Sequence, residues 1–239
     1  MDPERRRAAI GVIPSDWAEA LGQAASPRRL DPIAEWVADR RLTHSVLPAP
    51  EQVFAALHAT SFDSVRAVIL GQDPYPNPEH AMGLAFSVPR EVTDLPRSLK
   101  RIRAELETDC GVTLPEHGSL EAWTCHGVLL LNTTLTVDER GSDTHRDAGW
   151  RAFTDAVIDA VAAKETPVVF LLWGKHAQTK TRLIEARGQV ALPSPHPMAR
   201  LRQGFKGSHP FSGANAALAD PIDWRLDDYG DRQLPLAPR

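Results

Sequence analysis

The stretch "GQDPYP", residues 71–76, places a carboxylate and an aromatic ring among turn-forming residues, directly after the apolar run "VRAVIL". Pro74 removes a main-chain donor and restricts the backbone of Asp73 toward extended values. The carboxylate of Asp73 can therefore be held and aimed in one direction. The alternative is an Asx-turn, in which the same carboxylate only caps nearby amides.

Four other side chains have two interpretations each. Asn132 ends a run of apolar residues, and a buried amide needs partners for both its oxygen and its nitrogen. It is either a bridge between loops or a group that binds a polar ring from two sides. Tyr75 and Phe86 are either half-buried core aromatics or parts of a site, and His196, between two prolines, is either structural or functional.

Length and composition favour a single domain over residues 1–239, with peripheral tails at about 1–12 and 227–239. The 239 residues are 42% apolar, which is enough to bury one full core. No apolar run approaches the roughly 18 residues of a membrane span, so we expect a soluble, cytoplasmic protein with no membrane contact. Cys110 and Cys125 lack the number and spacing of iron–sulfur or zinc ligands, and we expect both to be reduced.

Charge is distributed unevenly along the chain. The net charge is −4, but residues 166–219 contain seven basic residues and one acid, a balance of +6 that leaves −10 for the rest. Such a run is either a solvated face or a surface that binds a polyanion. Because the segment includes turn-rich loops as well as a helical pattern, a binding edge is favoured.

Short apolar runs alternate with amphipathic stretches along the chain. Buried strands are predicted at 65–70, 127–132, 167–174 and 189–193. Helices are predicted at 31–41, 49–60, 97–110, 147–164 and 176–187, and a last one is N-capped by Ser212. The fold class is therefore α/β: a single domain with a central, mainly parallel four-stranded sheet flanked by helices on both faces. Ligand sites of such sheets lie at the carboxyl ends of the strands, where "GQDPYP", "NTTLTV", "GKHAQ" and "SPHPMAR" all occur.

In their order along the chain, the motifs resemble those of the family-1 uracil-DNA glycosylases. The match runs from about Val65 to Leu226 and includes "GQDPYP", "GLAFS", "LPRSLKRI", "GVLLLNTTLTV", "FLLWGKHAQ", "SPHP" and "GFKGSHPFSGAN". Ordered matches at compatible spacing exclude chance. The resemblance implies a monofunctional DNA repair enzyme that flips uracil out of DNA and hydrolyses its N-glycosidic bond. It also implies that the reaction leaves an abasic site and needs no metal or organic cofactor.

The same resemblance implies a catalytic pair. Asp73 corresponds to the acid that positions and activates the attacking water and favours the cationic sugar. His196 and the main-chain N–H of Gln72 correspond to donors for the uracil oxygen that gains charge, a contribution of about 3 kcal/mol per donor. For the histidine, the family's chemistry implies a neutral donor.

Three further positions correspond to the pocket for the base. Phe86 corresponds to the ring on which the flipped uracil stacks. Asn132 corresponds to the amide that pairs with the imide edge of uracil and disfavours cytosine. Tyr75, between two prolines, corresponds to the residue that excludes the 5-methyl group of thymine by overlap.

The resemblance also implies contacts with DNA phosphates, which position an enzyme without reading sequence. The matching positions are Pro96, Ser98, Lys175 and Ser208. "LPRS" has fewer prolines than the family's usual run, which weakens the expectation that this loop compresses DNA. Two of the phosphate-binding loops lie in the basic segment.

The loop after His196 departs from the family's pattern. The family's His-Pro-Ser-Pro-Leu-Ser is replaced by "HPMARLRQGFKGS", which is one residue shorter and lacks the phosphate-binding serine. Three residues are candidates to fill the base stack that uracil vacates, and a fourth lies nearby: Met198, Arg200 and Leu201, then Arg202. We expect the loop to rely less on apolar insertion and more on charge, and duplex binding therefore to weaken more steeply with added salt.

The expected partner is uracil-containing DNA, single- or double-stranded, bound by a monomer. A glycosylase-inhibitor protein and a replication clamp are further partners that the sequence does not test. One alternative is a DNA-binding relative that recognises uracil or single strands with little turnover. Another is a hydrolase with a Ser194, His196 and Asp73 triad, but Ser194 lacks the glycines of a nucleophile elbow.

Overall fold

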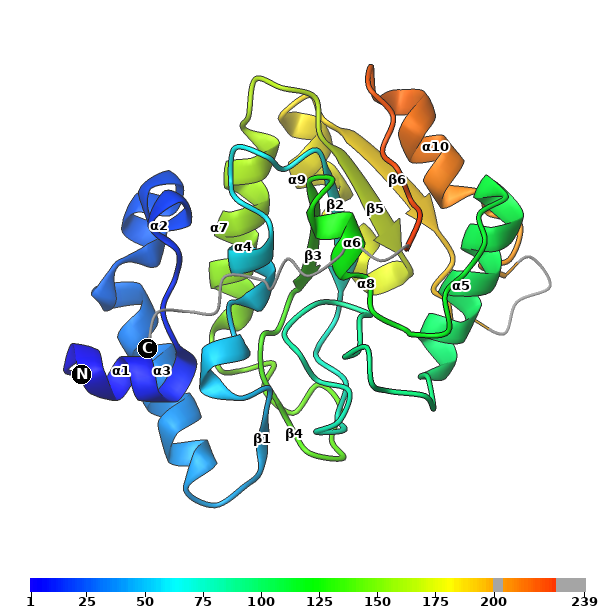
Figure 1. Cartoon of the computed structure of the whole chain (residues 1–239). Coiled ribbons are helices and arrows are strands. Elements are labelled where there is room, and N and C mark those ends of the chain that lie inside the picture. The colour runs from blue at the N-terminus through cyan, green and yellow to red at the C-terminus, as the bar shows by residue number, and fades with distance from the viewer. Residues whose placement is uncertain (200–203, 227–239) are drawn as a thin grey trace.

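The computed structural model describes residues 1–199 and 204–226. Its centre is a four-stranded sheet in the order β3-β2-β5-β6, in which all neighbouring strands run parallel (Figure 1). The strands are β2 (Ala67–Gly71), β3 (Val128–Asn132), β5 (Val169–Trp173) and β6 (Val190–Ser194). The predicted parallel sheet is confirmed, and each strand lies within about two residues of its expected position.

Burial along the strands follows their places in the sheet. Every residue of β2, β3 and β5 is buried, as expected where helices cover both faces of parallel strands. β6 is more exposed than β3, the other edge strand of the sheet, which contacts α4 and α6. Pro193 is tolerated there, since an edge strand has a side without ladder partners.

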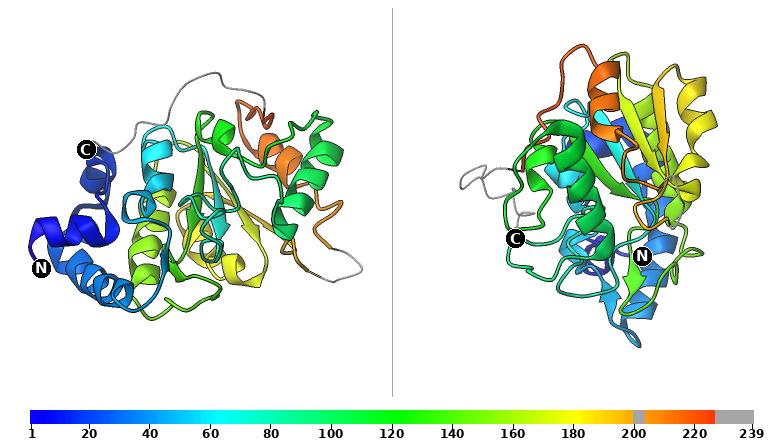
Figure 2. Two further views of the ribbon diagram at one scale, coloured as in Figure 1. Left: turned by 60° about the horizontal axis from the view of Figure 1, so that its bottom comes forward. Right: turned by 90° about the vertical axis from the view of Figure 1, so that its right-hand side faces the viewer.

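Helices cover both faces of the sheet. α5 (Arg97–Cys110) contacts α10 (Pro210–Ala217) on one side, and α7 (Trp150–Ala162) contacts α9 (Thr181–Ala186) on the other (Figure 2). Three short helices contact β3 or β5: α4 (Ala55–Ala59), α6 (Glu121–Thr124) and α8 (Lys175–Gln178). Among the helices described, none combines the length and apolar character that crossing a membrane requires.

A layer of N-terminal helices packs against α7, on the side of that helix away from the sheet. Its helices are α1 (Pro3–Ile10), α2 (Ser15–Leu21), η1 (Gly22–Ala25), α3 (Pro27–Arg41) and η2 (Pro50–Gln52). The expectation of a peripheral tail over residues 1–12 is wrong, because α1 packs against α3 and Ile10 is fully buried. In the sequence, the run of arginines in α1 makes the segment look solvated, although its last residues are apolar. The second expected tail, 227–239, lies outside the described residues.

A small antiparallel pair, β1 (Val46–Leu47) with β4 (Val137–Asp138), joins the N-terminal layer to the loop after β3. A chain of hydrogen bonds supports it: Trp150 Nε1 donates to the Thr136 hydroxyl at 2.7 Å, and that hydroxyl lies 2.7 Å from Nδ1 of His145. Nε2 of His145 lies 3.0 Å from Asp138, which also accepts from Arg40 of α3. These side chains fix the two ends of the 139–144 loop.

Several helices begin or divide at positions other than those predicted. The pattern at 176–187 forms two helices, α8 and α9, and the Thr179 hydroxyl donates to the His176 carbonyl at 2.7 Å, a local bond that competes with the helix ladder. The pattern at 49–60 likewise divides into η2 and α4. α3 begins at Pro27, and α7 begins at Trp150 after Gly149, whose φ is 94°.

The last helix, α10, begins earlier than its sequence predicts. Its N-cap is His209, in the left-handed region, so the predicted cap Ser212 lies inside the helix. Asp109 of α5 explains the difference, because its carboxylate accepts from the main-chain N–H groups of Phe211 and Ser212 at 2.9 and 3.0 Å. The free N–H groups of α10 are thus capped from another helix, which no local pattern reveals.

Candidate active site

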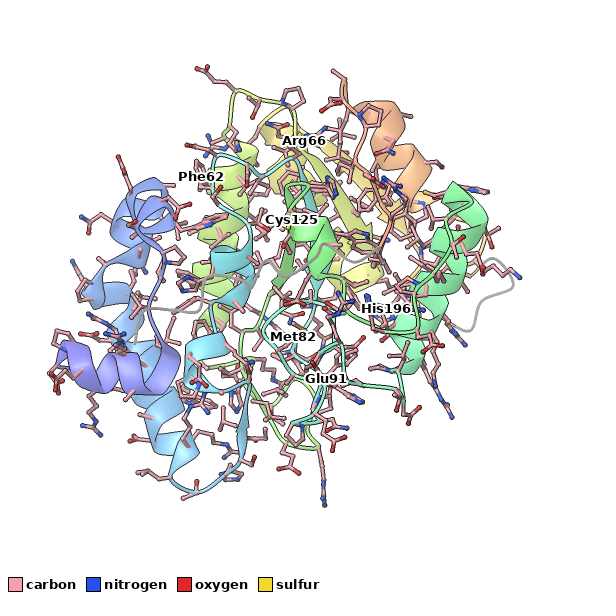
Figure 3. The ribbon with its side chains drawn as sticks, viewed as in Figure 1. Phe62, Arg66, Met82, Glu91, Cys125 and His196 are labelled. Carbon is pink, nitrogen blue, oxygen red and sulfur yellow. The ribbon has the colours of Figure 1, made fainter. Side chains whose placement is uncertain are left out.

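The four parallel strands end at one edge of the sheet. Figure 3 shows His196 at this edge, whereas Phe62 and Arg66 lie at the opposite one. The last residues of neighbouring strands lie opposite one another in register: Gly71 and Asn132, then Trp173 and Ser194. The predicted convergence of the strand ends is therefore confirmed.

Asp73 lies half-buried in the loop after β2, with one carboxylate oxygen fixed by a distant loop. Oδ2 accepts from the main-chain N–H of Asp143 at 2.6 Å and from the Ser142 hydroxyl at 3.3 Å. Burial raises the pKa of Asp73, and these hydrogen bonds oppose the rise because they favour the ionised form. Within residues 1–199 and 204–226, Oδ1 has no hydrogen-bond partner, so this oxygen is open to a water molecule.

The loop that fixes Asp73 was not identified from the sequence. Asp143 has a φ of 55°, a left-handed conformation that a residue with a side chain adopts at some energetic cost. Its carboxylate pairs with Arg151 of α7 at 2.8 Å. Aspartate tolerates this conformation better than most residues, so "RGSD" carried a weak turn signal but none for its distant partner.

Asn132 is the last residue of β3 and is only 4% exposed. Its side-chain amide makes no hydrogen bond to any described residue, although buried amides normally have partners. Of the two interpretations, a ligand-binding amide fits this geometry better than a bridge between loops. Gly71 makes room for it, since a Cβ at that position would lie 2.1 Å from Oδ1 of Asn132.

Tyr75 is fixed through its hydroxyl group. The hydroxyl lies 2.9 Å from Oγ of Ser98 in α5 and 3.3 Å from the carbonyl oxygen of Phe86. The ring of His80 meets the tyrosine ring edge-on, with centroids 6.0 Å apart. Burial raises the pKa of Tyr75 far above its ordinary value, so the phenol keeps its proton.

Phe86 is half-buried and has a φ of 64°. A bulky residue in the left-handed region is strained, and such strain persists where the surrounding structure imposes it, often at a functional site. The centroid of its ring lies 5.3 Å from that of Trp173 and 6.3 Å from that of His196. The structure thus brings the predicted stacking residue beside the predicted catalytic histidine.

His196 is held in one tautomer. Its Nδ1 accepts from the main-chain N–H of Met198 at 3.0 Å, so the proton of the neutral ring is on Nε2. Burial lowers the pKa of His196 below the ordinary 6.5, which favours this neutral form at pH 7. Gly174 packs closely against it, since a Cβ there would lie 2.7 Å from that of His196. Arg101 of α5 supports the same loop by donating to the Pro197 carbonyl at 2.8 Å.

A second histidine at this edge was not singled out from the sequence, although it lies in the predicted "GKHAQ" loop. Nε2 of His176 lies 2.7 Å from the Thr133 hydroxyl, which donates to the carbonyl of Gln72 at 3.0 Å. The hydroxyl therefore accepts from His176, and the chain of bonds fixes the main chain at Gln72. Burial lowers the pKa of His176, and the charges of Arg151 and Lys180 lower it further.

The predicted phosphate-contacting residues lie at or near the starts of helices. Pro96 is the N-cap of α5, Ser98 lies in its first turn, and Lys175 is exposed at the start of α8. Ser208 lies before α10, and Met198 is 37% exposed. The remaining candidates of the loop lie outside the described residues: Arg200, Leu201 and Arg202.

Part of the basic segment is neutralised within the fold. Lys180 pairs with Asp155 at 2.5 Å, and Arg187 pairs with Asp159 at 2.8 Å. Both acids belong to α7, so these two bases face a helix of this chain. Positive charge available for a polyanion is therefore smaller than the sequence balance of +6 indicates.

Similarity to known proteins agrees with this geometry. The uracil-DNA glycosylases of Bacillus licheniformis and Bacillus pumilus are 42% and 46% identical to this chain, over 220 and 217 residues. The matches cover 90% and 89% of this chain and 97% and 95% of those proteins. The mimivirus uracil-DNA glycosylase crystal structure has a similar fold, with a TM-score of 0.81 and 24% identity, covering 90% of this chain and 88% of that one. Residues 59–219 match the model of the uracil-DNA glycosylase superfamily, and the chain belongs to this superfamily.

Proposed function

We propose that this protein is a family-1 enzyme that removes uracil from DNA with Asp73 and His196 as its catalytic residues. The observation that supports this most strongly is that the site combines a hydrogen-bond acceptor with a hydrogen-bond donor. A carboxylate with one open oxygen and a histidine with its proton on Nε2 lie at the same sheet edge. These two groups suit hydrolysis of an N-glycosidic bond, because a cationic sugar and an anionic base develop together and each group stabilises one of the two charges.

Asp73 acts on the sugar side of the bond. Its open Oδ1 accepts a proton of the attacking water, whose oxygen bonds to the anomeric carbon as the bond to the base nitrogen breaks. The negative charge also stabilises the oxocarbenium character of the sugar. The electron pair of the broken bond leaves with uracil, so water is the only co-reactant and no oxidant is required.

His196 acts on the base. Its Nε2–H donates to the uracil oxygen on which negative charge develops, with the main-chain N–H of Gln72 as a second donor. A neutral imidazole stabilises this oxygen without having to give up its proton. The bond from Met198 supports this role, because it leaves Nε2 as the only protonated nitrogen.

The pocket selects uracil by shape and hydrogen bonding. Asn132 pairs with the imide edge, its oxygen accepting from the ring N–H and its nitrogen donating to a carbonyl, a pattern that cytosine does not match. Phe86 stacks on the flipped base. Tyr75 occupies the space beside C5 and excludes the methyl group of thymine.

The rim of the site binds DNA through its phosphates. Ser98, Lys175 and Ser208 contact the backbone, with Pro96 at the start of α5 beside them. Met198 is the described candidate for insertion into the vacated stack. The protein acts as a monomer on single- or double-stranded DNA. Because a mimivirus variant was solved in complex with UGI, we also propose this rim as the surface for an inhibitor protein.

The test is uracil release from matched single-stranded and duplex oligonucleotides without added metal, with thymine and cytosine substrates alongside. We expect release of uracil alone and a loss of about a thousandfold in kcat for Asp73→Asn. The matched control is Asp147→Asn, since this carboxylate is 88% exposed and pairs with Arg146, not with a residue of the proposed site. Binding of DNA without release of any base would overturn the proposal in favour of a recognition protein.

A further inference from the structure

The hydroxyl group of Tyr75 links the base pocket to the phosphate-binding start of α5. It lies 2.9 Å from Oγ of Ser98 and 3.3 Å from the carbonyl oxygen of Phe86. Ser98 is half-buried in the first turn of α5, so one face of its hydroxyl can still meet a phosphate. A residue assigned to the DNA backbone thus also touches the side chain that borders C5 of the base.

We propose that Ser98 determines specificity as well as contacting phosphate: its hydroxyl holds the Tyr75 ring in place against substituents at C5 of the base. The inference rests on the proposed function, because it concerns the same pocket. It assigns to Ser98 a positioning role that acts through Tyr75 and does not touch the base.

The hydroxyl groups of Tyr75 and Ser98 have two protons to donate, and the acceptors are each other's oxygen, the Phe86 carbonyl and, when DNA is bound, a phosphate. The phenol stays protonated, so Tyr75 and Ser98 each donate one hydrogen bond. Without DNA, Ser98 donates to Tyr75 and Tyr75 donates to the Phe86 carbonyl. With a phosphate oxygen beside Ser98, its proton turns outward, and Tyr75 then donates to Ser98. The 2.9 Å contact therefore persists in both arrangements.

The contact matters because the Tyr75 ring excludes a substituent at C5 by steric overlap only if the ring keeps its position. The two flanking prolines fix the backbone at Tyr75, but the ring itself is fixed at its far end by the hydroxyl. Loss of Ser98 Oγ leaves only the longer contact to Phe86. The ring can then tilt away from C5 by breaking only the weaker hydrogen bond to Phe86, and this tilt makes room for a methyl-sized group.

The experiment compares kcat/KM for 5-bromouracil and uracil in the same single-stranded oligonucleotide, since bromine is close to methyl in size. We expect Ser98→Ala to raise the ratio of 5-bromouracil to uracil about fivefold, the effect of one hydrogen bond of about 1 kcal/mol. Tyr75→Phe is expected to raise it by a similar factor, and the double variant no further. Ser98→Thr keeps the hydroxyl and is expected to keep the wild-type ratio.

Ser208→Ala is the matched control, because Ser208 is the other proposed phosphate-binding serine and its hydroxyl donates to the Phe205 carbonyl, not to Tyr75. It is expected to lower kcat/KM for both bases equally and to leave their ratio unchanged. An unchanged ratio in folded Ser98→Ala, or equal shifts in both serine variants, would overturn the proposal. Thermal melting confirms that each variant is folded.

The two roles of Ser98 fail in different ways. If Ser98→Ala raises KM and leaves the ratio of 5-bromouracil to uracil unchanged, Ser98 only contacts phosphate and the inference is wrong. If it raises the ratio and leaves KM unchanged, Ser98 positions Tyr75 and only the assigned phosphate contact is wrong. If the wild-type protein released no base at all, the ratio of its affinities for free 5-bromouracil and free uracil, measured by equilibrium dialysis, would test the selection at C5 without turnover. A ratio that Ser98→Ala leaves unchanged there also overturns the inference.

Discussion

The main-chain N–H of Asp143 donates to Oδ2 of Asp73 at 2.6 Å, across 70 residues of sequence. The bond orients the proposed water-activating carboxylate and leaves its other oxygen open. It also brings a second carboxylate near the first, whose charge adds to the rise in the pKa of Asp73 that burial causes. Asp143 therefore both positions Asp73 and affects its ionisation.

The acidic limb of the pH–rate profile should report this arrangement. Asp73 must be ionised, so activity falls as pH drops through its raised pKa. Asp143→Asn keeps the main-chain donor and removes the charge, so the limb should move to lower pH. Arg151→Met removes the cation that pairs with Asp143, so the limb should move to higher pH. The measurement is kcat/KM against pH for both variants.

Protonation of His196 could produce a similar limb, so the same profiles are measured in a His196→Gln background, where that group cannot titrate. His176, whose pKa responds to the same charges of Arg151 and Asp143, is replaced by Asn in this background, and the limb that remains then belongs to Asp73. Shifts in the same direction for Asp143→Asn and Arg151→Met would contradict the arrangement, because the two substitutions change the local charge with opposite signs.

Gly71 is required by the position of Asn132. Gly71→Ala would place a Cβ 2.1 Å from Oδ1 of Asn132 and 3.0 Å from the Ala85 side chain, so the amide must move. We expect kcat/KM for uracil to fall at least a hundredfold, since a misplaced amide leaves the imide edge of uracil unpaired. The control is Gly213→Ala in α10, where a Cβ meets only Leu192 at an ordinary 3.8 Å. A similar loss of activity in both variants would count against this role of Gly71.

The sheet and its loop positions could be predicted from the sequence because they depend on local patterns. Continuous apolar runs identified the parallel strands, and the 3.6-residue pattern of α5 gave its bounds as Arg97–Cys110. Strand ends then placed Asp73 and His196 at one edge of the sheet. The resemblance of ordered motifs supplied the proposed roles of these residues, which no periodicity could.

The contacts that position the site residues could not be predicted, because each joins segments that are distant in the sequence. Asp143 reaches Asp73 from another loop, and Ser98 reaches Tyr75 from a helix. Nothing in a local pattern states which donor meets which acceptor. Helix α1 was missed for a related reason, since its buried end depends on the later helix α3.

Glu105 should control DNA binding through the loop that contains Ser208. Its buried carboxylate accepts from the main-chain N–H groups of Gly207 and His209 at 2.6 and 2.9 Å, on either side of the serine. Glu105→Gln replaces one acceptor oxygen by a donor that faces an N–H group. We expect KM for a uracil-containing oligonucleotide to rise about tenfold with a smaller change in kcat, the effect of one lost charge-assisted bond.

Two controls separate this effect from general destabilisation. Lys206→Gln, in the same loop, removes an exposed charge and should weaken binding only in a salt-dependent way. Activity of Glu105→Gln is measured well below its melting temperature. A fall in kcat with an unchanged KM would show that Glu105 supports the catalytic groups and not the phosphate contact.

Asp138 should stabilise the fold in a pH-dependent way. Its hydrogen bond with Arg40, helped by His145, lowers the pKa of the carboxyl from 3.8 to about 2. A pKa below the unfolded value means that the stabilisation is complete above about pH 4, where the carboxyl is ionised in both states. It is lost as pH falls from there through about 2. Asp138→Asn should lower the free energy of unfolding at pH 7 by about 2 kcal/mol and flatten its acid dependence.

Asp223 provides the matched control. Its pKa is also lowered to about 2, chiefly by Arg225, but these partners are only two residues apart. A pair so close in sequence persists in part in the unfolded chain, so its effect on the difference between folded and unfolded states is smaller. Urea unfolding between about pH 3 and 7 should therefore show a large change for Asp138→Asn and a small one for Asp223→Asn. Equal changes would mean that the link from α3 to β4 adds nothing beyond a local ion pair.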